Sequence, residues 1–216
     1  YFLKKQLFWL ALGFPVALAC ATASLSHLRS LARFGALPCL FLPALALVPG
    51  LGLEVNGASR WVRLGPLTLQ PVEAAKLAFV FYMADSLSRK GEKIRRFVPG
   101  VLVPAALVGL MGLVLVAQPD LGNALLVSSI LGTMLFLGGA RLTHLAVPLI
   151  GGLPVAYVLV FHSAYRRARV LAFLDPFADP LKSGFQLIQS FIAFGSGGLM
   201  GKGLGHSGQK LFYLPE

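Results

Sequence analysis

The sequence predicts an all-α polytopic membrane protein. Of its 216 residues, 56% are hydrophobic and only 12% are charged, a balance typical of membrane proteins rather than of soluble domains. The apolar residues also gather into runs long enough to span a bilayer. The two cysteines and four histidines are scattered without ligand spacing, so the sequence indicates neither a disulfide framework nor a metal site.

Six segments are long and apolar enough to form spanning helices. They are Gln6–Leu25, Gly35–Leu53, Pro71–Ser88, Val98–Ala117, Leu121–Gly139 and Leu142–Phe161. Several contain proline or glycine, which spanning helices tolerate when neighbouring groups satisfy the freed backbone. We therefore expect residues 1–161 to form a transmembrane helical bundle and residues 162–216 to form one large outer loop of the same domain.

The basic residues between these segments assign the two sides of the membrane. Because successive spans alternate in direction, the connections fall into two sets. One set consists of His27–Arg33, Arg89–Arg96 and Arg141. It carries eight Lys and Arg residues, whereas the other short connections carry four, so the positive-inside bias places the first set in the cytoplasm. The segments Asn56–Gln70 and 118–122 and the whole outer loop then face outward.

The third predicted span begins with two ionisable residues, Glu73 and Lys76. Each costs roughly 2.5–3.5 kcal/mol at mid-bilayer, so such residues mark a functional site by default. They lie on one face of a helix and can pair. A purely structural role is also open. With Gln70 as the N-cap and Pro71 at the first helical position, Glu73 would stabilise the helix start and Lys76 would extend its stem to the interface.

Two further charged residues are predicted at the outer surface. Asp120 lies in a tight turn between two predicted spans, where it would act as a helix N-cap. Arg60 lies in the segment Asn56–Gln70, which is predicted to be a polar, turn-rich loop. Its guanidinium is a candidate cation for an anionic substrate.

The predicted outer loop is basic, with Arg166, Arg167 and Arg169 clustered near its start. Guanidinium groups suit bidentate phosphate recognition, which favours a site for an anionic substrate, although contact with anionic lipid headgroups would explain the same charges. The apolar run Leu187–Phe194 is too short to span and is predicted to form a re-entrant or interfacial helix. The glycines that follow would either form backbone N–H concavities for an anion or act as a flexible connection.

Three blocks of the sequence carry a family resemblance. They are NGASRWVRLGPLTLQPVEAAKL, AQPDLGNAL and RVLAFLDPFADPLKSGFQLIQSFIAFGSGGLMGKGLGHSGQKLFYLPE. In this order they resemble the SEDS family (shape, elongation, division and sporulation), polytopic glycosyltransferases that polymerise peptidoglycan, and the likeness extends across nearly the whole chain. The stretches EVNGAS and QKLFYLPE resemble the division member of the family more than the elongation member.

The resemblance implies a fold of about ten spanning helices, of which this chain would hold about six. It implies an enzyme of the bacterial cytoplasmic (inner) membrane that acts on lipid II, a disaccharide-peptide joined by pyrophosphate to a polyprenyl tail. The implied partners are the nascent glycan chain, membrane lipid, a class B penicillin-binding protein transpeptidase and other division proteins, with no nucleic acid. Whether a divalent cation such as Mg²⁺ takes part is left open. The family pattern continues past Leu-Pro-Glu with a His-Thr-Asp-Phe motif, whose aspartate is the main candidate for the catalytic base.

The resemblance also implies roles for individual residues. The candidate catalytic residues are Glu73, Lys76 and Asp120. The candidate substrate-binding residues are Arg60, Arg166, Lys202, Gln209, Lys210 and Glu216. The chain departs from the family pattern at Val72, Asn123 and His206, where Ser or Ala, Thr and Asn are usual. These departures leave the charged positions intact, and we interpret them as variation.

Two other classes of function fit the sequence. A transporter that flips lipid II would also carry intramembrane charges and broken helices. A non-catalytic scaffold for a transpeptidase would need Glu73 and Lys76 only for stability. An outward-facing carboxylate required for chemistry distinguishes the enzyme from both.

Overall fold

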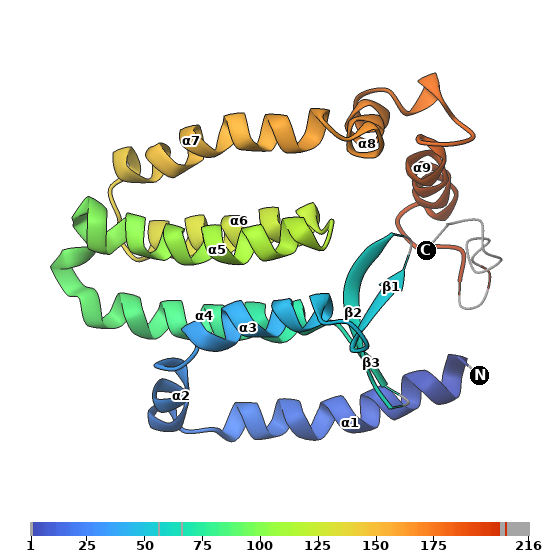
Figure 1. Ribbon diagram of the computed structural model, residues 1–216. Helices are drawn as coiled ribbons and strands as arrows, with labels where there is room; N and C mark the ends of the chain where they lie inside the picture. The colour runs from blue at the N-terminus through green and yellow to red at the C-terminus, as the bar shows by residue number, and fades with distance from the viewer. Residues whose placement is uncertain (1, 56, 66, 204–205, 207–216) are drawn as a thin grey trace. The chain divides into compact units, whose positions relative to one another are not determined.

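The computed structural model describes residues 2–55, 57–65, 67–203 and 206. The contacts divide the chain into two compact units, Tyr1–Pro148 and Leu149–Glu216. The first unit is a helical bundle with a small sheet (Figure 1). Its elements are α1 (Phe2–Thr22), α2 (Leu25–Ala32), α3 (Ala36–Ala44), the 3₁₀ turn η1 (Leu45–Leu47), β1 (Gly52–Val55), β2 (Ala58–Leu64), β3 (Leu67–Leu69), α4 (Pro71–Lys90), the short turns η2 (Gly91–Arg95) and η3 (Val98–Leu102), α5 (Val103–Ala117), α6 (Leu121–Leu137) and the start of α7 (Leu142–Phe161). The second unit holds the rest of α7, α8 (Ala164–Leu174), η4 (Pro176–Ala178) and α9 (Phe185–Gly197).

Three helices of the described chain are each long and apolar enough to cross a membrane. They are Leu3–Thr22, Val98–Ala117 and Leu142–Phe161, and they match three of the predicted spans. The pair Leu25–Ala32 and Ala36–Leu47, bent by 61°, would count together as a fourth. The protein is therefore a mostly helical, multi-pass membrane protein, as predicted, although the predicted number of six spans is not confirmed.

The remaining predicted spans, at α4 and α6, are helices that fall short of a full apolar span. Helix α4 is 20 residues long but carries three charged side chains, Glu73, Lys76 and Asp85, before its last two residues. Helix α6 has only 17 residues. Both helices have the predicted positions, and whether each crosses the membrane stays a prediction.

The prediction of one continuous span over Gly35–Leu53 is wrong in its second half. Helix α3 ends at Ala44 and is followed by the 3₁₀ turn η1. Strand β1 begins at Gly52, so Leu53 lies in a strand rather than at the end of a helix. Val48 is extended, with φ −75° and ψ 123°. It precedes Pro49, whose ring disfavours the helical conformation at the residue before it. The helical path therefore ends at this proline rather than at the end of the apolar run.

The segment predicted as a polar loop instead forms most of a three-stranded antiparallel sheet in the order β1-β2-β3. On one side, β2 pairs with β3 in continuous register. On the other side, Trp61 pairs with Leu53 and Ser59 with Glu54, so Arg60 has no partner on β1. A bulge of this kind bends the strand and redirects a side chain, and bulges are common beside active sites. Arg60 therefore differs from the residues on either side of it in β2, Ser59 and Trp61, which both pair with β1.

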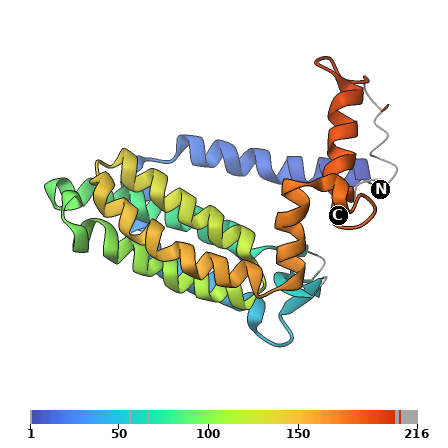
Figure 2. The same cartoon turned by 90° about the horizontal axis from the view of Figure 1, so that it is seen from above.

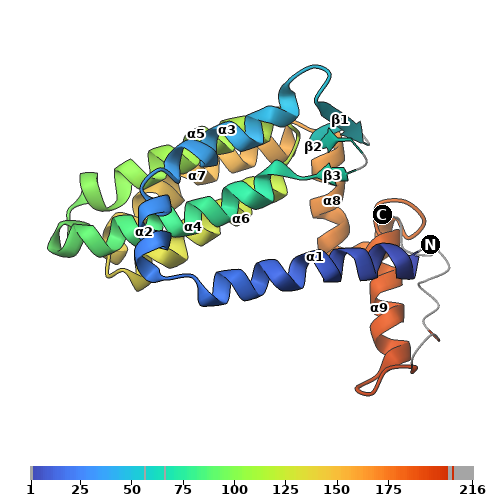
Figure 3. The same ribbon diagram turned by 90° about the horizontal axis from the view of Figure 1, so that it is seen from below.

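The sheet lies at one end of the helices and the α4–α5 connection lies at the other (Figures 1 and 3). Helices α4, α5 and α6 run alongside one another in the view from above as well (Figure 2). The turn between α5 and α6 is on the same end as the sheet. The segments predicted to face outward, Asn56–Gln70 and 118–122, therefore share one end of this bundle, opposite the loop Arg89–Arg96.

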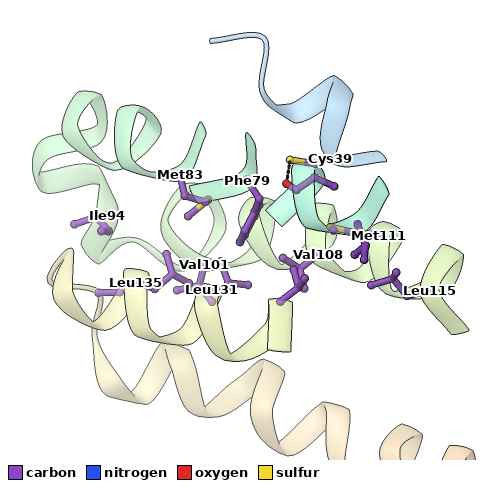
Figure 4. Packing of buried hydrophobic residues seen from close by; sticks show 14 residues of the cluster. Cys39, Phe79, Met83, Ile94, Val101, Val108, Met111, Leu115, Leu131 and Leu135 are labelled. Carbon is purple, nitrogen blue, oxygen red and sulfur yellow. Dashed lines mark hydrogen bonds between the residues drawn. The ribbon is translucent and has the colours of Figure 1, made fainter. Parts of the chain in front are cut away.

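The core of the first unit lies where α3, α4, α5 and α6 meet (Figure 4). Phe79 of α4, Met111 of α5 and Leu135 of α6 are at most 1% exposed there. Gly35, just before α3, allows the close approach of this helix to α4, because a Cβ at this position would lie 2.8 Å from the Ala78 carbonyl oxygen. The packing holds α4 and α6 firmly enough to position the side chains at their ends.

The second unit contains a short helix, α9, where the sequence predicts one, but this helix is longer than predicted. Helix α9 has 13 residues and extends beyond the predicted run Leu187–Phe194 at both ends. Gly195 and Gly197, predicted to belong to a glycine-rich connection, lie within this helix. Because the helix continues through them, only the later glycines are available for a turn or an anion-binding concavity.

Candidate functional site

Five polar side chains of the first unit form one continuous network at the sheet end of the bundle. They are Arg60 of β2, Glu73 and Lys76 of α4, and Asp120 and Asn123 at the start of α6. The sequence pointed to four of these residues through unrelated features, and the structure brings the four together. Asn123 is the fifth, and it joins them.

Lys76 is the centre of the half of the network that belongs to α4. Its Nζ donates to Oε1 of Glu73 at 2.8 Å and to Oδ1 of Asn123 at 3.2 Å. The Lys76 side chain is 15% exposed and that of Glu73 is 59% exposed. The predicted pairing of the two charges is therefore confirmed, and the ammonium is bonded within the protein rather than extended alone toward the interface.

The start of α4 follows the predicted pattern. Gln70 is the N-cap and Pro71 occupies the first helical position, although the Gln70 side chain makes no capping hydrogen bond. Glu73 lies in the first turn, where a carboxylate meets the positive end of the helix dipole. The structural and functional interpretations of Glu73 are therefore compatible, because one carboxylate both stabilises the helix start and binds Lys76.

Asp120 is the centre of the half that belongs to α6. Its side chain is 5% exposed, and it is the N-cap of α6, as predicted, with Oδ1 accepting from the Asn123 backbone N–H at 3.4 Å. Its Oδ2 accepts from Nδ2 of Asn123 at 2.8 Å. A capping role alone needs only the first of these bonds. The second bond connects the buried carboxylate to the rest of the network.

Arg60 completes the network from the sheet. Its Nε lies 3.9 Å from Oδ1 of Asp120, and its Nη2 donates to the carbonyl oxygen of Pro119. Nε is buried and has no hydrogen-bond partner, so the contact with Asp120 is ionic. Because the bulge leaves Arg60 unpaired on β1, this side chain can reach the turn before α6. The guanidinium has five N–H donors, so most of them remain available.

The turn that carries Asp120 is anchored to a third helix. Gln118 is only 2% exposed, and its Nε2 donates to the carbonyl oxygen of Pro43 in α3. A buried amide needs such a partner, because leaving it unsatisfied would cost about 1–3 kcal/mol. This bond fixes the turn between α5 and α6 against α3, and with it the position of Asp120.

The charges of the network alternate and cancel. Glu73 and Asp120 are negative and Lys76 and Arg60 are positive, so each cation faces a carboxylate. The two ends, Glu73 and Arg60, are 59% and 37% exposed, whereas the side chains of Lys76 and Asp120 are 15% and 5% exposed. The geometry therefore suits a rigid polar surface that offers one carboxylate and one guanidinium. It does not supply the surplus positive charge that a phosphate clamp needs.

Two other predicted substrate-binding residues belong to the second unit. Arg166 is half-buried on α8, and Lys202 is exposed after α9, both in the second unit. Arg169, from the same basic cluster as Arg166, places its guanidinium 5.0 Å from the centre of the Tyr165 ring, a cation–π contact. Gln209, Lys210 and Glu216 lie outside the described residues.

The second unit also has an open apolar depression of about 680 Å³ on α7 and α8. Its lining includes Ile150, Leu153, Tyr157 and Phe161 of α7 and Val170 of α8. These side chains offer almost no polar group, so the depression suits hydrocarbon rather than a sugar or a phosphate.

Among the described residues, no group of three or more His, Cys, Asp or Glu side chains is placed to hold a metal ion. The carboxylates of Glu73 and Asp120 are each engaged with a cation. The sequence left a divalent cation such as Mg²⁺ open, and these residues do not supply a set of ligands for one.

The sequence interpretation missed Asn123 as a member of the site. The family resemblance marks Asn123 only as a departure from a position where Thr is usual. One signal was present: Asn123 is three residues after Asp120 and therefore on the same face of the helix. The link to Lys76, which is 47 residues away in the chain, had no such signal.

Comparison with known proteins identifies relatives over the whole chain. The model of the FtsW, RodA and SpoVE family, described as "Cell cycle protein", matches residues 1–216. A protein of Geobacter sulfurreducens named "Probable peptidoglycan glycosyltransferase FtsW" is 43% identical over the full chain. A protein of Nitrosococcus halophilus with the same name is 45% identical over 217 aligned residues. The chain spans 58% and 56% of the lengths of these two relatives.

Solved structures are similar as well. A chain from a structure described as "Structural coordination of polymerization and crosslinking by a peptidoglycan synthase complex" matches with a TM-score of 0.71 and 40% identity, covering 91% of this chain and 58% of that one. The rod shape determining protein RodA of Thermus thermophilus, in its D255A form, matches with a TM-score of 0.61 and 35% identity, covering 74% of this chain and 50% of that one.

Proposed function

Because the chain belongs to the FtsW, RodA and SpoVE family of cell cycle proteins, we propose that it forms part of a peptidoglycan glycosyltransferase. The enzyme polymerises lipid II into glycan strands at the outer face of the bacterial cytoplasmic membrane during cell division. The names of relatives that are 43% and 45% identical support this assignment. A relative's name does not by itself establish the reaction, so the assignment also needs a site whose residues can perform the chemistry.

The single observation that carries the proposal is the five-residue network at the sheet end of the bundle. Ionised groups are costly in a spanning segment and concentrate where a protein handles a polar substrate. An isolated pair would suffice to stabilise one helix. A network that connects β2, α4 and α6 and ends in two exposed charged groups is better suited to holding a ligand.

The proposed reaction joins two lipid-linked sugars. A hydroxyl of the incoming lipid II attacks the anomeric carbon of the growing glycan, and a carboxylate base takes the hydroxyl proton. The bond from that carbon to the lipid pyrophosphate breaks, and the pyrophosphate leaves with the electron pair. Attack opposite the leaving group inverts the anomeric centre and gives a β-linkage. Cations stabilise the charge that develops on the pyrophosphate.

The exposures in the network divide the proposed roles. Glu73 and Arg60, as the exposed ends, contact the sugar or its phosphate. Lys76 and Asp120, in the interior, hold those two groups in place. The network has no surplus positive charge, and the candidate cations for the pyrophosphate are Arg166 and Lys202 of the outer loop, on the evidence of that loop's basic sequence.

A partner follows from the solved relative. That structure is described as a complex that coordinates polymerization and crosslinking. By analogy, this protein works with a class B penicillin-binding protein transpeptidase and with other division proteins, and the transpeptidase crosslinks the strands that it makes.

Purified full-length protein incubated with lipid II tests the function directly. We expect glycan strands to form, which gel electrophoresis of the product would detect. Movement of lipid II across vesicle membranes without polymer would instead favour a flippase. If neither activity occurs while the transpeptidase still binds, the protein is a scaffold.

A second experiment tests the role of the outer loop. The double variant Arg166→Glu, Lys202→Glu should bind lipid II roughly 30-fold more weakly, since each of the two cations contributes about 1 kcal/mol near an anionic group. Lys182→Glu is the control, because Lys182 is exposed in the same loop but outside the proposed clamp. Equal binding by the double variant and wild type would refute the clamp.

A further inference from the structure

Asn123 is the only uncharged member of the network, and it joins the two halves. Its Oδ1 accepts from Nζ of Lys76 at 3.2 Å, and its Nδ2 donates to Oδ2 of Asp120 at 2.8 Å. The first bond crosses from the second turn of α4 to the first turn of α6, and the second bond lies within the start of α6. Within the described part of the chain, the Lys76–Asn123 bond is the side-chain bond of this network that joins α4 to α6.

The chemistry of the three groups explains why an amide stands between them. A lysine ammonium only donates hydrogen bonds, and an ionised carboxylate only accepts them. The amide does both, so one side chain satisfies a partly buried cation and a buried anion at the same time. Leaving either group unsatisfied at 15% or 5% exposure would be costly.

We propose that Asn123 is a positioning residue that orders Lys76 and Asp120 and thereby fixes the exposed groups Glu73 and Arg60. Its importance for catalysis rests on the proposed function, whereas its effect on Lys76 does not. Asn123 is placed between two interior charges rather than at an exposed end, so its effect on the substrate is indirect.

Two variants of similar size separate hydrogen bonding from packing. Asn123→Thr introduces a hydroxyl, which both donates and accepts, and threonine is the residue that the family resemblance places here. Asn123→Val has the same branched shape and neither capacity. In both variants the backbone N–H of residue 123 still donates to Asp120, so the cap of α6 is preserved.

The first readout is the rate at which a small acylating reagent modifies Lys76, measured by mass spectrometry of the full-length protein in detergent. Lys90, at the other end of α4, is the internal reference. We expect Asn123→Val to raise the relative rate about tenfold, because a hydrogen bond to a charged group is worth about that factor. Asn123→Thr should stay close to wild type.

The second readout is glycan synthesis from lipid II. Asn123→Val should slow it about tenfold and Asn123→Thr should restore it. Unchanged Lys76 labelling in Asn123→Val would overturn the inference, as would an equal loss of synthesis in the two variants. If labelling responds as expected while wild type makes no glycan, the positioning role stands and the proposed function fails.

Discussion

Helix α4 carries an ion pair near each end, and the two pairs are arranged in opposite ways. In the first pair the cation is the more buried partner, with Lys76 at 15% and Glu73 at 59% exposure. In the second pair, Asp85 at 5% exposure meets Arg89 at 56%, with 2.7 Å between Oδ2 and Nη2. An ion pair on this helix is therefore not by itself a sign of function.

The two pairs differ most in what lies around them. Lys76 has a second partner on α6, and through Asn123 it is connected to Asp120 and Arg60. Within the described part of the chain, the only charged partner of Asp85 is Arg89, four residues along the same helix. Connection across elements, rather than burial of a charge, therefore distinguishes the candidate site from a local helix-stabilising pair.

The largest expected effect follows from removing the buried cation of the first pair. Lys76→Met keeps the length of the side chain but removes its charge, and it leaves Glu73 and Asn123 without their donor. We expect glycan synthesis by the full-length protein to fall by more than about 100-fold, because each of the two lost bonds to the ammonium costs about 1.5–3 kcal/mol. Normal folding with activity near that of wild type would reject a role for this charge.

The second pair should respond in stability rather than in activity. Arg89→Met leaves the buried Asp85 carboxylate without its cation, which should lower the stability of the protein by about 1–3 kcal/mol. Thermal unfolding in detergent measures this change, and activity per folded molecule should stay within about twofold of wild type, since this end of α4 lies away from the network.

The control for this prediction is the double variant Asp85→Asn, Arg89→Met. Removing both charges together should recover part of the lost stability, because the unpaired carboxylate no longer exists. If Arg89→Met stops glycan synthesis while the protein remains as stable as wild type, the second pair belongs to the site and the contrast between the two ends is wrong.

The smallest expected effect on stability comes from Glu73→Gln. The carboxylate is exposed, and exposed ion pairs contribute only about 0–1 kcal/mol. The unfolding temperature should therefore barely change, while glycan synthesis should fall severalfold if Glu73 contacts the substrate. A large loss of stability with unchanged activity would assign Glu73 to the helix start alone.

Local chemistry in the sequence was enough to predict much of the candidate site. Charges in an apolar helix, Glu73 and Lys76, and a carboxylate opening a helix, Asp120, each carry their own signal within a few residues. The link between Lys76 and Asn123 and the bulge at Arg60 were not predictable in this way. An amide becomes a connector only when two distant helices place a cation and an anion beside it, and a bulge depends on the register of a neighbouring strand.

The sequence by itself determined that this is a multi-pass helical membrane protein and where most of its helices lie, because hydrophobicity and helix-start signals act over one or two turns. The tertiary structure alone decided that β1, β2 and β3 form a sheet and that five side chains meet beside it, those of Arg60, Glu73, Lys76, Asp120 and Asn123. The physical reason is range: strand pairing and buried hydrogen bonds join residues that are far apart in the chain, and packing of α3, α4, α5 and α6 brings those residues together.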